Sequence, residues 1–305
     1  MIIITTMVKI LFAMALGFFL RKIKIITPEA NSTISRVIVD VLFPCLIFVS
    51  IVQMDSSRRG DVISLVLIGI AIYVVIIGLS FLIVRMLRAP KKDRGIYEAA
   101  LVFGNVTALG IPLAESLYGD VGVFFIAILN VHFNLLLYTY GVYRITKGNS
   151  NTYKFNAKKL LNPGIVVMVI AMIVYFAGLK MPNIVMEPLS FLGQAASPFS
   201  MISVGASIAG YSLKNSFNNW RLYVIAAFKL LIIPIAVFFI LKLIIGTGLM
   251  TSVTAIYVGM PTAVAVGMFS VAYNEDSSLA SAAVAMQAIL SMGTVPLLYM
   301  IIQNV

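Results

Sequence analysis

Ten long apolar segments divide this chain of 305 residues, and they constrain its fold more than any other feature. Each is close to the roughly 20 residues that a helix needs to cross the hydrocarbon core of a bilayer. The segments are 2–20, 33–53, 62–84, 97–118, 122–143, 162–179, 189–211, 220–242, 251–273 and 278–301. Only 11% of all residues are charged, against about 25% in soluble proteins. The sequence therefore predicts an all-α polytopic membrane protein with ten transmembrane helices.

Lys and Arg are distributed unevenly between successive loops. The loops after the first, third, fifth and seventh segments hold fifteen of them, whereas the opposite loops hold only Arg58, Arg59 and Lys180. Basic residues are retained on the cytoplasmic side, so both termini are predicted to be extracytoplasmic in a multi-pass protein of the cell (plasma) membrane. The net charge of +11 is then a consequence of topology. The lipid bilayer is the expected partner, and no nucleic acid is.

Prolines recur at matched places in the two halves of the chain. Pro44 and Pro112 are 68 residues apart in the second and fourth segments, and Pro198 and Pro261 are 63 apart in the seventh and ninth. Five spans in each half would make the second half enter the membrane with opposite polarity. We therefore predict two inverted five-helix repeats, 1–150 and 151–305. The alternative is that each proline is simply tolerated within its helix.

The prolines of the fourth and ninth segments predict helix breaks near the middle of the bilayer. Half-helices beginning near Leu113 and after Pro261 would direct their N-terminal amides toward a common point. Such partly positive helix ends favour anions. Polar side chains at the breaks are those of Asn105, Thr107 and Thr262. The pattern predicts that an anionic group of a substrate binds at this crossing.

Two stretches of the sequence resemble a known family. The run from Asn105 to Gly110-Ile111-Pro112-Leu113 is similar to the fourth-helix motif of the auxin efflux carrier family, and the stretch from Pro261 to Tyr299 resembles its last two helices. The resemblance implies the fold of bile acid:sodium symporters, with two inverted five-helix repeats and crossed broken helices 4 and 9. It also implies an elevator-type mechanism, in which a transport core of helices 3–5 and 8–10 moves against a scaffold of helices 1, 2, 6 and 7.

The length of the connection between the halves bears on the substrate. Only about 18 residues, from Arg144 to Leu161, join the halves, which resembles short-loop bacterial members rather than plant members with a long loop. The resemblance implies transport of small organic anions, mono- or dicarboxylates such as malate or malonate. A sodium-coupled symporter of the bile-acid type is the alternative, followed by a channel or membrane receptor on the same fold. No enzyme is expected, because the chain lacks metal, acid-pair and nucleophile–base motifs.

Residues near the breaks, and polar residues within the spans, are candidates for substrate binding. They are Asn105, Thr107, Gly110, Pro112, Asn130, Asn134, Pro261, Thr262, Gln287 and Lys229. A lysine in the middle of a span is a candidate for function by default. Lys229 is expected to counter a substrate carboxylate, to pair with an acid such as Asp40, or to be structural.

Other polar residues leave two interpretations open. Asp40 follows Arg36 by four residues, the spacing of an ion pair on a helix, and the alternative is a proton or cation site. Glu115 is a surface residue or takes part in coupling, and His132 is structural or relays protons. The small residues from Gly193 to Gly210 predict close helix packing, with Gln194 or Ser200 as further candidates for the substrate path. No cofactor or metal is expected, and H+ or Na+ coupling and a homodimer remain open.

Overall fold

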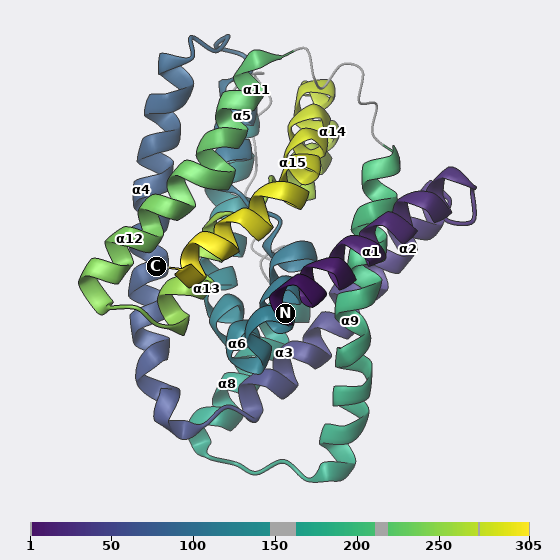
Figure 1. The fold of residues 1–305 in the computed structure, drawn as a ribbon, viewed down its shortest axis with the longest axis vertical. Coiled ribbons are helices and arrows are strands. Elements are labelled where there is room, and N and C mark those ends of the chain that lie inside the picture. Colours follow the sequence, from purple (N-terminus) through teal and green to yellow (C-terminus); the bar gives the residue numbers. More distant parts are fainter. Residues whose placement is uncertain (1, 147–162, 211–218, 274, 305) are drawn as a thin grey trace. The chain divides into compact units, whose positions relative to one another are not determined.

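The computed structural model describes residues 2–146, 163–210, 219–273 and 275–304. Within these ranges the regular elements are helices, and one isolated antiparallel bridge joins Gly104 and Thr262 (Figure 1). Most of the segment that connects the predicted halves lies outside the described residues, as does Asn274.

Several helical stretches are long and apolar enough to cross a membrane. The described residues contain five: Pro28–Val52, Ser56–Met86, Val106–Thr146, Trp220–Ile245 and Ser277–Asn304. Two shorter apolar helices are Pro163–Ala177 and Leu249–Val258. The chain is thus a polytopic helical membrane protein. The count of ten spans and the inverted repeats stay predictions.

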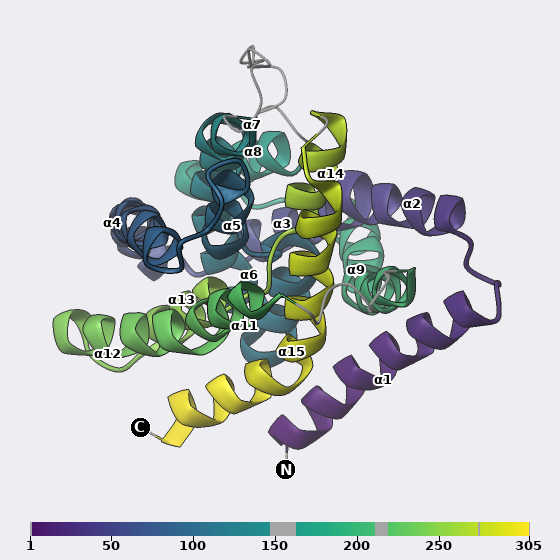
Figure 2. The same ribbon diagram turned by 90° about the horizontal axis from the view of Figure 1, so that it is seen from above.

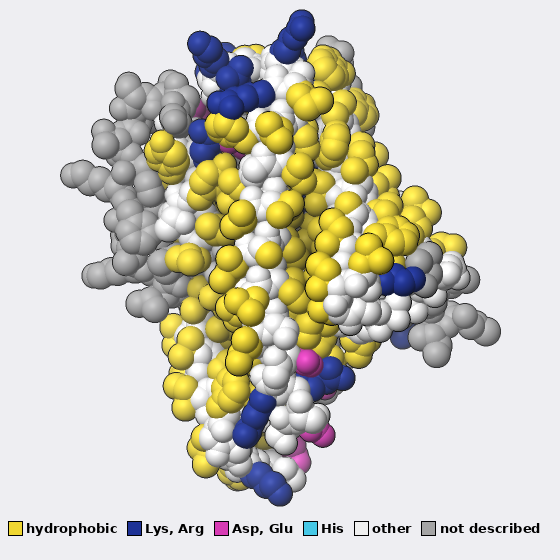
Figure 3. All heavy atoms as spheres, turned by 90° about the vertical axis from the view of Figure 1, so that its left-hand side faces the viewer, with side chains coloured by type: hydrophobic (Ala, Val, Ile, Leu, Met, Phe, Trp, Pro, Cys, Tyr) yellow, Lys and Arg dark blue, Asp and Glu magenta, His cyan; other side chains and the backbone are white. Residues whose placement is uncertain are grey.

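The surface of helix α4 (Arg59–Met86) shows how the chain meets lipid. Its outward face carries large exposed side chains, among them Ile63, Leu67, Val74 and Leu82. Figure 3 shows the same pattern on one face of the molecule, where hydrophobic side chains cover most of the surface and Lys and Arg gather mainly toward its ends. Apolar side chains left in water would be costly, so this face is suited to the hydrocarbon region.

The helices form two compact units, which are described separately. Unit 1 comprises the described residues of Met1–Val66, Thr107–Val131 and Ala157–Gly210, and unit 2 those of Leu67–Val106, His132–Asn156 and Tyr211–Val305. The elements that lie wholly in unit 1 are α1 (Ile2–Lys22), α2 (Pro28–Val37), η1 (Ile38–Leu42), α3 (Phe43–Val52), η2 (Ser56–Arg58), α8 (Pro163–Ala177) and α9 (Asn183–Gly210).

The other elements are in unit 2 or cross between the units. Those wholly in unit 2 are α5 (Arg94–Val102), η4 (Leu137–Gly141), α7 (Val142–Thr146), α11 (Trp220–Ala227), η6 (Phe228–Ile232), α12 (Ile233–Ile245), α13 (Leu249–Val258), α14 (Val264–Ala272) and α15 (Ser277–Asn304). Those that cross are α4, η3 (Val106–Gly110) and α6 (Ile111–Leu136). Helix α6 is broken at Gly119, whose φ of 60° lies in the left-handed region that glycine adopts readily. This break falls between the predicted fourth and fifth spans.

Helices α1 and α9 pack closely in unit 1, as Figures 1 and 2 show. A Cβ atom at Gly205 would lie 1.9 Å from the carbonyl oxygen of Met14, and one at Gly17 would lie 1.9 Å from that of Ile202. Each helix therefore presents a glycine to the backbone of the other, as small residues do at helix interfaces in membranes. The close packing expected for the stretch from Gly193 to Gly210 is confirmed here.

Three prolines directly follow helical segments with wider, π-helical turns. Pro44, Pro112 and Pro234 each occupy the second position of an α-helix that follows a five-residue π-helical segment (η1, η3 and η6). A proline lacks an N–H and its ring clashes with the carbonyl group four residues earlier, and a π turn widens the helix at that point. Pro198, by contrast, lies inside α9, which continues through it.

The break expected at Pro112 therefore lies elsewhere. The chain leaves α5 after Val102, is non-helical through Asn105, and resumes helical structure at Val106, so Pro112 follows the break rather than forming it. The prediction that the half-helix begins near Leu113 was wrong by seven residues, because the π-helical turn of η3 accommodates the proline.

A buried ion pair joins α5 to α7 in unit 2. Glu98 Oε1 and Oε2 accept hydrogen bonds from Arg144 Nη2 and Nε, both at 2.5 Å, and the Glu98 side chain is only 1% exposed. Gly95 permits this pairing, because a Cβ atom there would lie 1.8 Å from the carbonyl oxygen of Arg144. A bidentate pair of this kind fixes the orientation of both side chains.

Replacement of Gly205 by Val should destabilise the protein through the α1–α9 contact. The new side chain meets the backbone of Met14, which cannot rotate away, and overpacking of this kind costs about 1–3 kcal/mol. Thermal unfolding of the purified protein in detergent should show a lower midpoint. The control is Gly78→Val on α4, where a Cβ atom meets nothing within 4 Å. Equal midpoints for the two variants would contradict the close packing.

Replacement of Arg144 by Met should be more damaging than loss of the whole ion pair. It leaves the Glu98 carboxylate buried without its partner, at a cost of about 3–5 kcal/mol, whereas a double replacement of Glu98 and Arg144 by Met removes both charges. The unfolding midpoints of wild type, the two single variants and the double variant form a double-mutant cycle. If the fall in midpoint of the double variant equalled the sum of the two single falls, the two side chains would not interact.

Candidate functional site

Two non-helical segments pair with each other inside unit 2. The first is Phe103 to Asn105, between α5 and η3, and the second is Gly259 to Ala263, between α13 and α14. The backbone N–H of Asn105 donates to the carbonyl oxygen of Pro261 at 2.6 Å, and that of Ala263 donates to Phe103 at 2.9 Å. In a membrane such groups must find partners within the protein. We call these two paired segments the crossing.

Thr262 and Gln287 satisfy further backbone groups at the crossing. The Thr262 hydroxyl donates to the carbonyl oxygen of Ala100 at 2.8 Å, and the Thr262 N–H donates to Gln287 Oε1 at 3.1 Å. Both side chains are buried, with 1% and 0% exposure. The hydroxyl of Thr262, expected to meet the substrate, is therefore engaged with the protein backbone.

Lys229 reaches the crossing from η6. Its ammonium group donates to the carbonyl oxygen of Val102 at 3.2 Å, and the residue is 2% exposed. Val102 is the last residue of α5, where the helix dipole is negative, so the helix end offers partial compensation for the lysine charge. Lys229 forms no ion pair within the described part of the chain, and Asp40 instead faces Arg36, with 3.9 Å between Nε and Oδ2. The ion pair expected between Arg36 and Asp40 is thus confirmed.

Two buried donors at the crossing have hydrogen-bonding capacity left. Gln287 Nε2 is inaccessible to solvent and has no hydrogen-bond partner among the described residues. The ammonium group of Lys229 has three hydrogens and makes one hydrogen bond to a described residue. An unsatisfied buried amide costs about 1–3 kcal/mol, so a bound polar group would be stabilised here.

The remaining candidates of the fourth segment, Thr107, Gly110 and Pro112, belong to unit 1. Ser200 Oγ on α9 donates to the carbonyl oxygen of Ala108, four residues before Pro112. Pro112 has no N–H to donate to this carbonyl group, and the Ser200 hydroxyl gives the group a donor. Ser197 Oγ donates to the half-buried Glu115 in the same unit. This engagement explains Ser200 without a substrate, and Gln194 is exposed.

The polar residues of α6 lie near its C-terminal end. Asn134 is buried and Asn130 half-buried, but the two belong to different units. His132 packs against α4, since a Cβ atom at Gly69 would lie 2.6 Å from its Nδ1. This contact gives His132 a structural role in packing.

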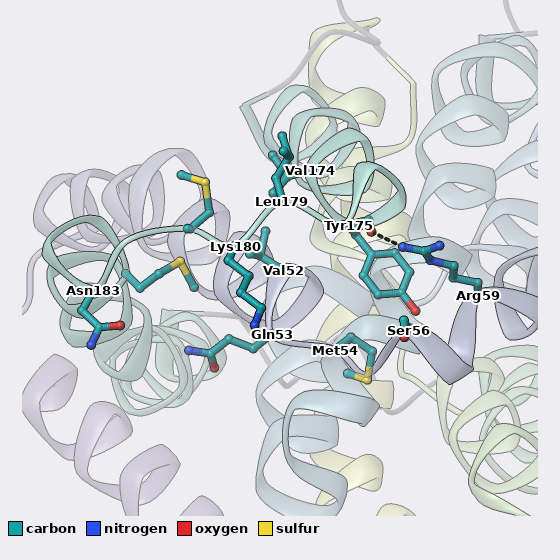
Figure 4. A pocket seen from close by; sticks show the side chains of 13 residues that line it. Val52, Gln53, Met54, Ser56, Arg59, Val174, Tyr175, Leu179, Lys180 and Asn183 are labelled. Carbon is teal, nitrogen blue, oxygen red and sulfur yellow. Dashed lines mark hydrogen bonds between the residues drawn. The ribbon is translucent and has the colours of Figure 1, made fainter.

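Each unit also has a cavity whose lining includes no residue of the crossing. One of about 540 Å³ in unit 1 is lined by residues that include Arg59, Tyr175 and Lys180 (Figure 4). The other, of about 260 Å³ in unit 2, surrounds the Glu98–Arg144 pair. The residues that line these cavities were not among the site residues predicted from the sequence. The available signal was that Arg59 and Lys180 are exceptions to the charge asymmetry of the loops. Among the described residues no cluster of three His, Cys, Asp or Glu side chains could hold a metal ion.

Comparison with known proteins gives consistent matches. The sequence model of a family described as membrane transport protein matches residues 2–299. The chain is 25% identical over 293 residues to an uncharacterized transporter of Methanothermobacter thermautotrophicus, covering 96% of each chain. It is 23% identical over 285 residues to an uncharacterized transporter of Methanocaldococcus jannaschii, covering 90% of this chain and 91% of the relative. A match of 27% identity over 152 residues covers 47% of this chain and 25% of Protein ECM3 of Saccharomyces cerevisiae.

Replacement of Thr262 by Val should test the side chain's part in the crossing. Valine keeps the shape but leaves the Ala100 carbonyl group without its hydroxyl donor, which costs about 1–3 kcal/mol when the group is buried. The unfolding midpoint should fall for Thr262→Val and stay close to wild type for Thr262→Ser, which keeps the hydroxyl. A normal midpoint for the valine variant would show that the hydroxyl bond contributes nothing.

Proposed function

Because this chain belongs to the membrane transport protein family, we propose that it is a secondary active transporter of small organic anions. The family match agrees with the resemblance to auxin efflux carriers and with the expectation that the chain is not an enzyme. The proposed substrates are mono- or dicarboxylates such as malate or malonate, and the proposed location is the plasma membrane with both termini outside.

The observation that carries this proposal is the buried ammonium group of Lys229. It lies at the crossing without a carboxylate partner in the described residues. A buried charge is costly unless it is paired, and an anion entering the site would pair it. A substrate carboxylate bound there can accept hydrogen bonds from Lys229 Nζ and Gln287 Nε2.

The backbone supports the same assignment. Helix α14 begins at Val264, immediately after the crossing, so the positive end of its dipole lies there. The paired backbones use the N–H groups of Asn105 and Ala263 together with the carbonyl groups of Pro261 and Phe103, and the unused donors beside them belong to the side chains of Lys229 and Gln287. An excess of donors favours an acceptor, and a carboxylate is acceptor-only. Asn105 and Asn134 remain proposed contacts within unit 2, and Thr107 and Asn130 remain candidates in unit 1.

We propose an elevator-type mechanism in which two parts of the chain move relative to each other. Unit 1 holds α1, α2, α3, α8 and α9, the helices that the resemblance assigns to the scaffold, and unit 2 holds α5 and α11–α15 of the transport core. This division supports the proposal. Two segments differ, because the start of α4 up to Val66 and the segment Thr107–Val131 group with unit 1. In the second of these, Ser200 and Ser197 bind residues of the segment.

Coupling and assembly remain to be measured. Proton coupling, sodium coupling as in bile-acid symporters, and a homodimer are all compatible with the proposal. Uptake into proteoliposomes at several pH values, with and without Na+, separates the first two. A channel would give single-channel currents without saturation by substrate.

The decisive variant is Lys229→Met, which removes the charge and keeps much of the side-chain volume. A charge-assisted hydrogen bond is worth about 1.5–3 kcal/mol, so substrate affinity should fall by about 10- to 100-fold. Uptake of labelled malonate and malate into proteoliposomes measures the change. Gln287→Leu should lower affinity less, because the amide is neutral.

The matched control is Lys9→Met, which removes an exposed lysine on α1. Its uptake should equal that of the wild type, with comparable protein in the membrane for all variants. Full uptake by Lys229→Met would reject a role for this lysine in substrate binding.

A further inference from the structure

The larger cavity lies within unit 1, between the end of α3 and the connection from α8 to α9. It has a volume of about 540 Å³, and its polar lining comes from Gln53, Ser56, Arg59, Lys180 and Asn183. The positive-inside rule assigns these loops to the extracytoplasmic side. The cavity is therefore placed where a solute outside the cell can enter it.

The basic residues of these loops are not equivalent. Of the three that oppose the charge asymmetry, Arg58 pairs with Asp61, with 3.0 Å between Nη1 and Oδ2. Arg59 and Lys180 line the cavity, and neither forms an ion pair with a described residue. Two cations that form no ion pair with a described residue thus share one cavity, which lacks an acidic side chain in its lining.

Arg59 is held in place on one side of the cavity. Its Nη2 donates to the carbonyl oxygen of Tyr175 at 3.1 Å, and its guanidinium carbon lies 5.7 Å from the centre of the Tyr175 ring. Its Nε is buried and has no hydrogen-bond partner in the described ranges. The guanidinium group is therefore positioned with an unused donor.

Lys180 lies at a different part of the cavity. Figure 4 shows its side chain ending beside Gln53, away from Arg59 and Tyr175. Asn183 lies beyond it on the same side of the cavity. The positive groups are thus separated along the cavity, with amide groups near the lysine. This arrangement favours a ligand with an anionic group at each end.

Asp55, the acidic residue that precedes Ser56 in this loop, has partners of its own. Asp55 Oδ1 accepts a hydrogen bond from the Ser57 N–H at 2.7 Å, and this backbone bond holds the pKa of the carboxyl group below its usual value. The Asp55 carbonyl oxygen accepts from the Tyr175 hydroxyl at 2.8 Å. Asp55 therefore anchors the loop to α8 and does not form an ion pair with Arg59.

We propose that this cavity is a second anion site, which binds a small dicarboxylate between Arg59 and Lys180 on the extracytoplasmic side. One carboxylate accepts hydrogen bonds from the Arg59 guanidinium group, and the other lies at Lys180 and Gln53. Its role as an entry site for transported substrate rests on the proposed function, whereas ligand binding itself does not.

The test measures binding of malonate, malate and acetate to purified protein by calorimetry in detergent, using Lys229→Met protein to weaken the crossing site. Arg59→Gln and Lys180→Gln should each weaken malonate binding by at least about tenfold, as expected for loss of a charge-assisted bond. Arg58→Gln is the matched control, because it removes the same charge from the same loop and should bind malonate within about twofold of its parent.

Three results would overturn the proposal. They are no malonate binding to Lys229→Met protein, malonate binding by the Arg59 and Lys180 variants as tight as that of their parent, or acetate binding as tight as malonate binding. Because Lys180 is exposed, its variant tests the site even where Arg59→Gln fails to fold. In uptake assays, Lys180→Gln should raise the KM for malonate and keep the maximal rate. Malonate binding that depends on Arg59 and Lys180, in a protein with no uptake, would support this site and reject the transport function.

Discussion

The pairing of two interrupted helices is the interaction on which the rest of unit 2 depends. A helix that opens in a bilayer exposes N–H and C=O groups that have no water to bind. Here Asn105 and Ala263 donate to Pro261 and Phe103, and Thr262 and Lys229 cover two carbonyl groups at the end of α5. Beside these bonds, the side chains of Lys229 and Gln287 keep unused donors. The proposed anion site rests on these side-chain donors.

Much of this arrangement could be predicted from the sequence. Apolar length predicted a polytopic helical membrane protein, which the structure and the family match support, whereas the orientation drawn from the loop charges stays a prediction. The sequence predicted that Pro261, Asn105 and Thr262 lie at one crossing of two broken helices, and the structure does bring these three residues together. These patterns are local in sequence, because hydropathy and proline content act on the helix that contains them.

Other features could not be predicted from such patterns. Pro112 follows the break because the π-helical turn of η3 accommodates the proline, and Ser200 supplies the hydrogen bond that the proline removes. That bond joins residues 92 positions apart. The bidentate pairing of Glu98 with Arg144 also joins residues far apart in the sequence, 46 positions from each other. It depends on the close approach of the two backbones that Gly95 allows. Long-range contacts of single side chains leave no periodic signal in a sequence.

The central claim is that a carboxylate binds at the crossing, where Lys229 and Gln287 hold unused donors. A cryo-electron microscopy map of the protein reconstituted with malonate tests it most directly. The account predicts density for a carboxylate within hydrogen-bonding distance of Lys229 Nζ and Gln287 Nε2. A map with malonate only in the Arg59–Lys180 cavity, and an empty crossing under saturating malonate, would contradict it.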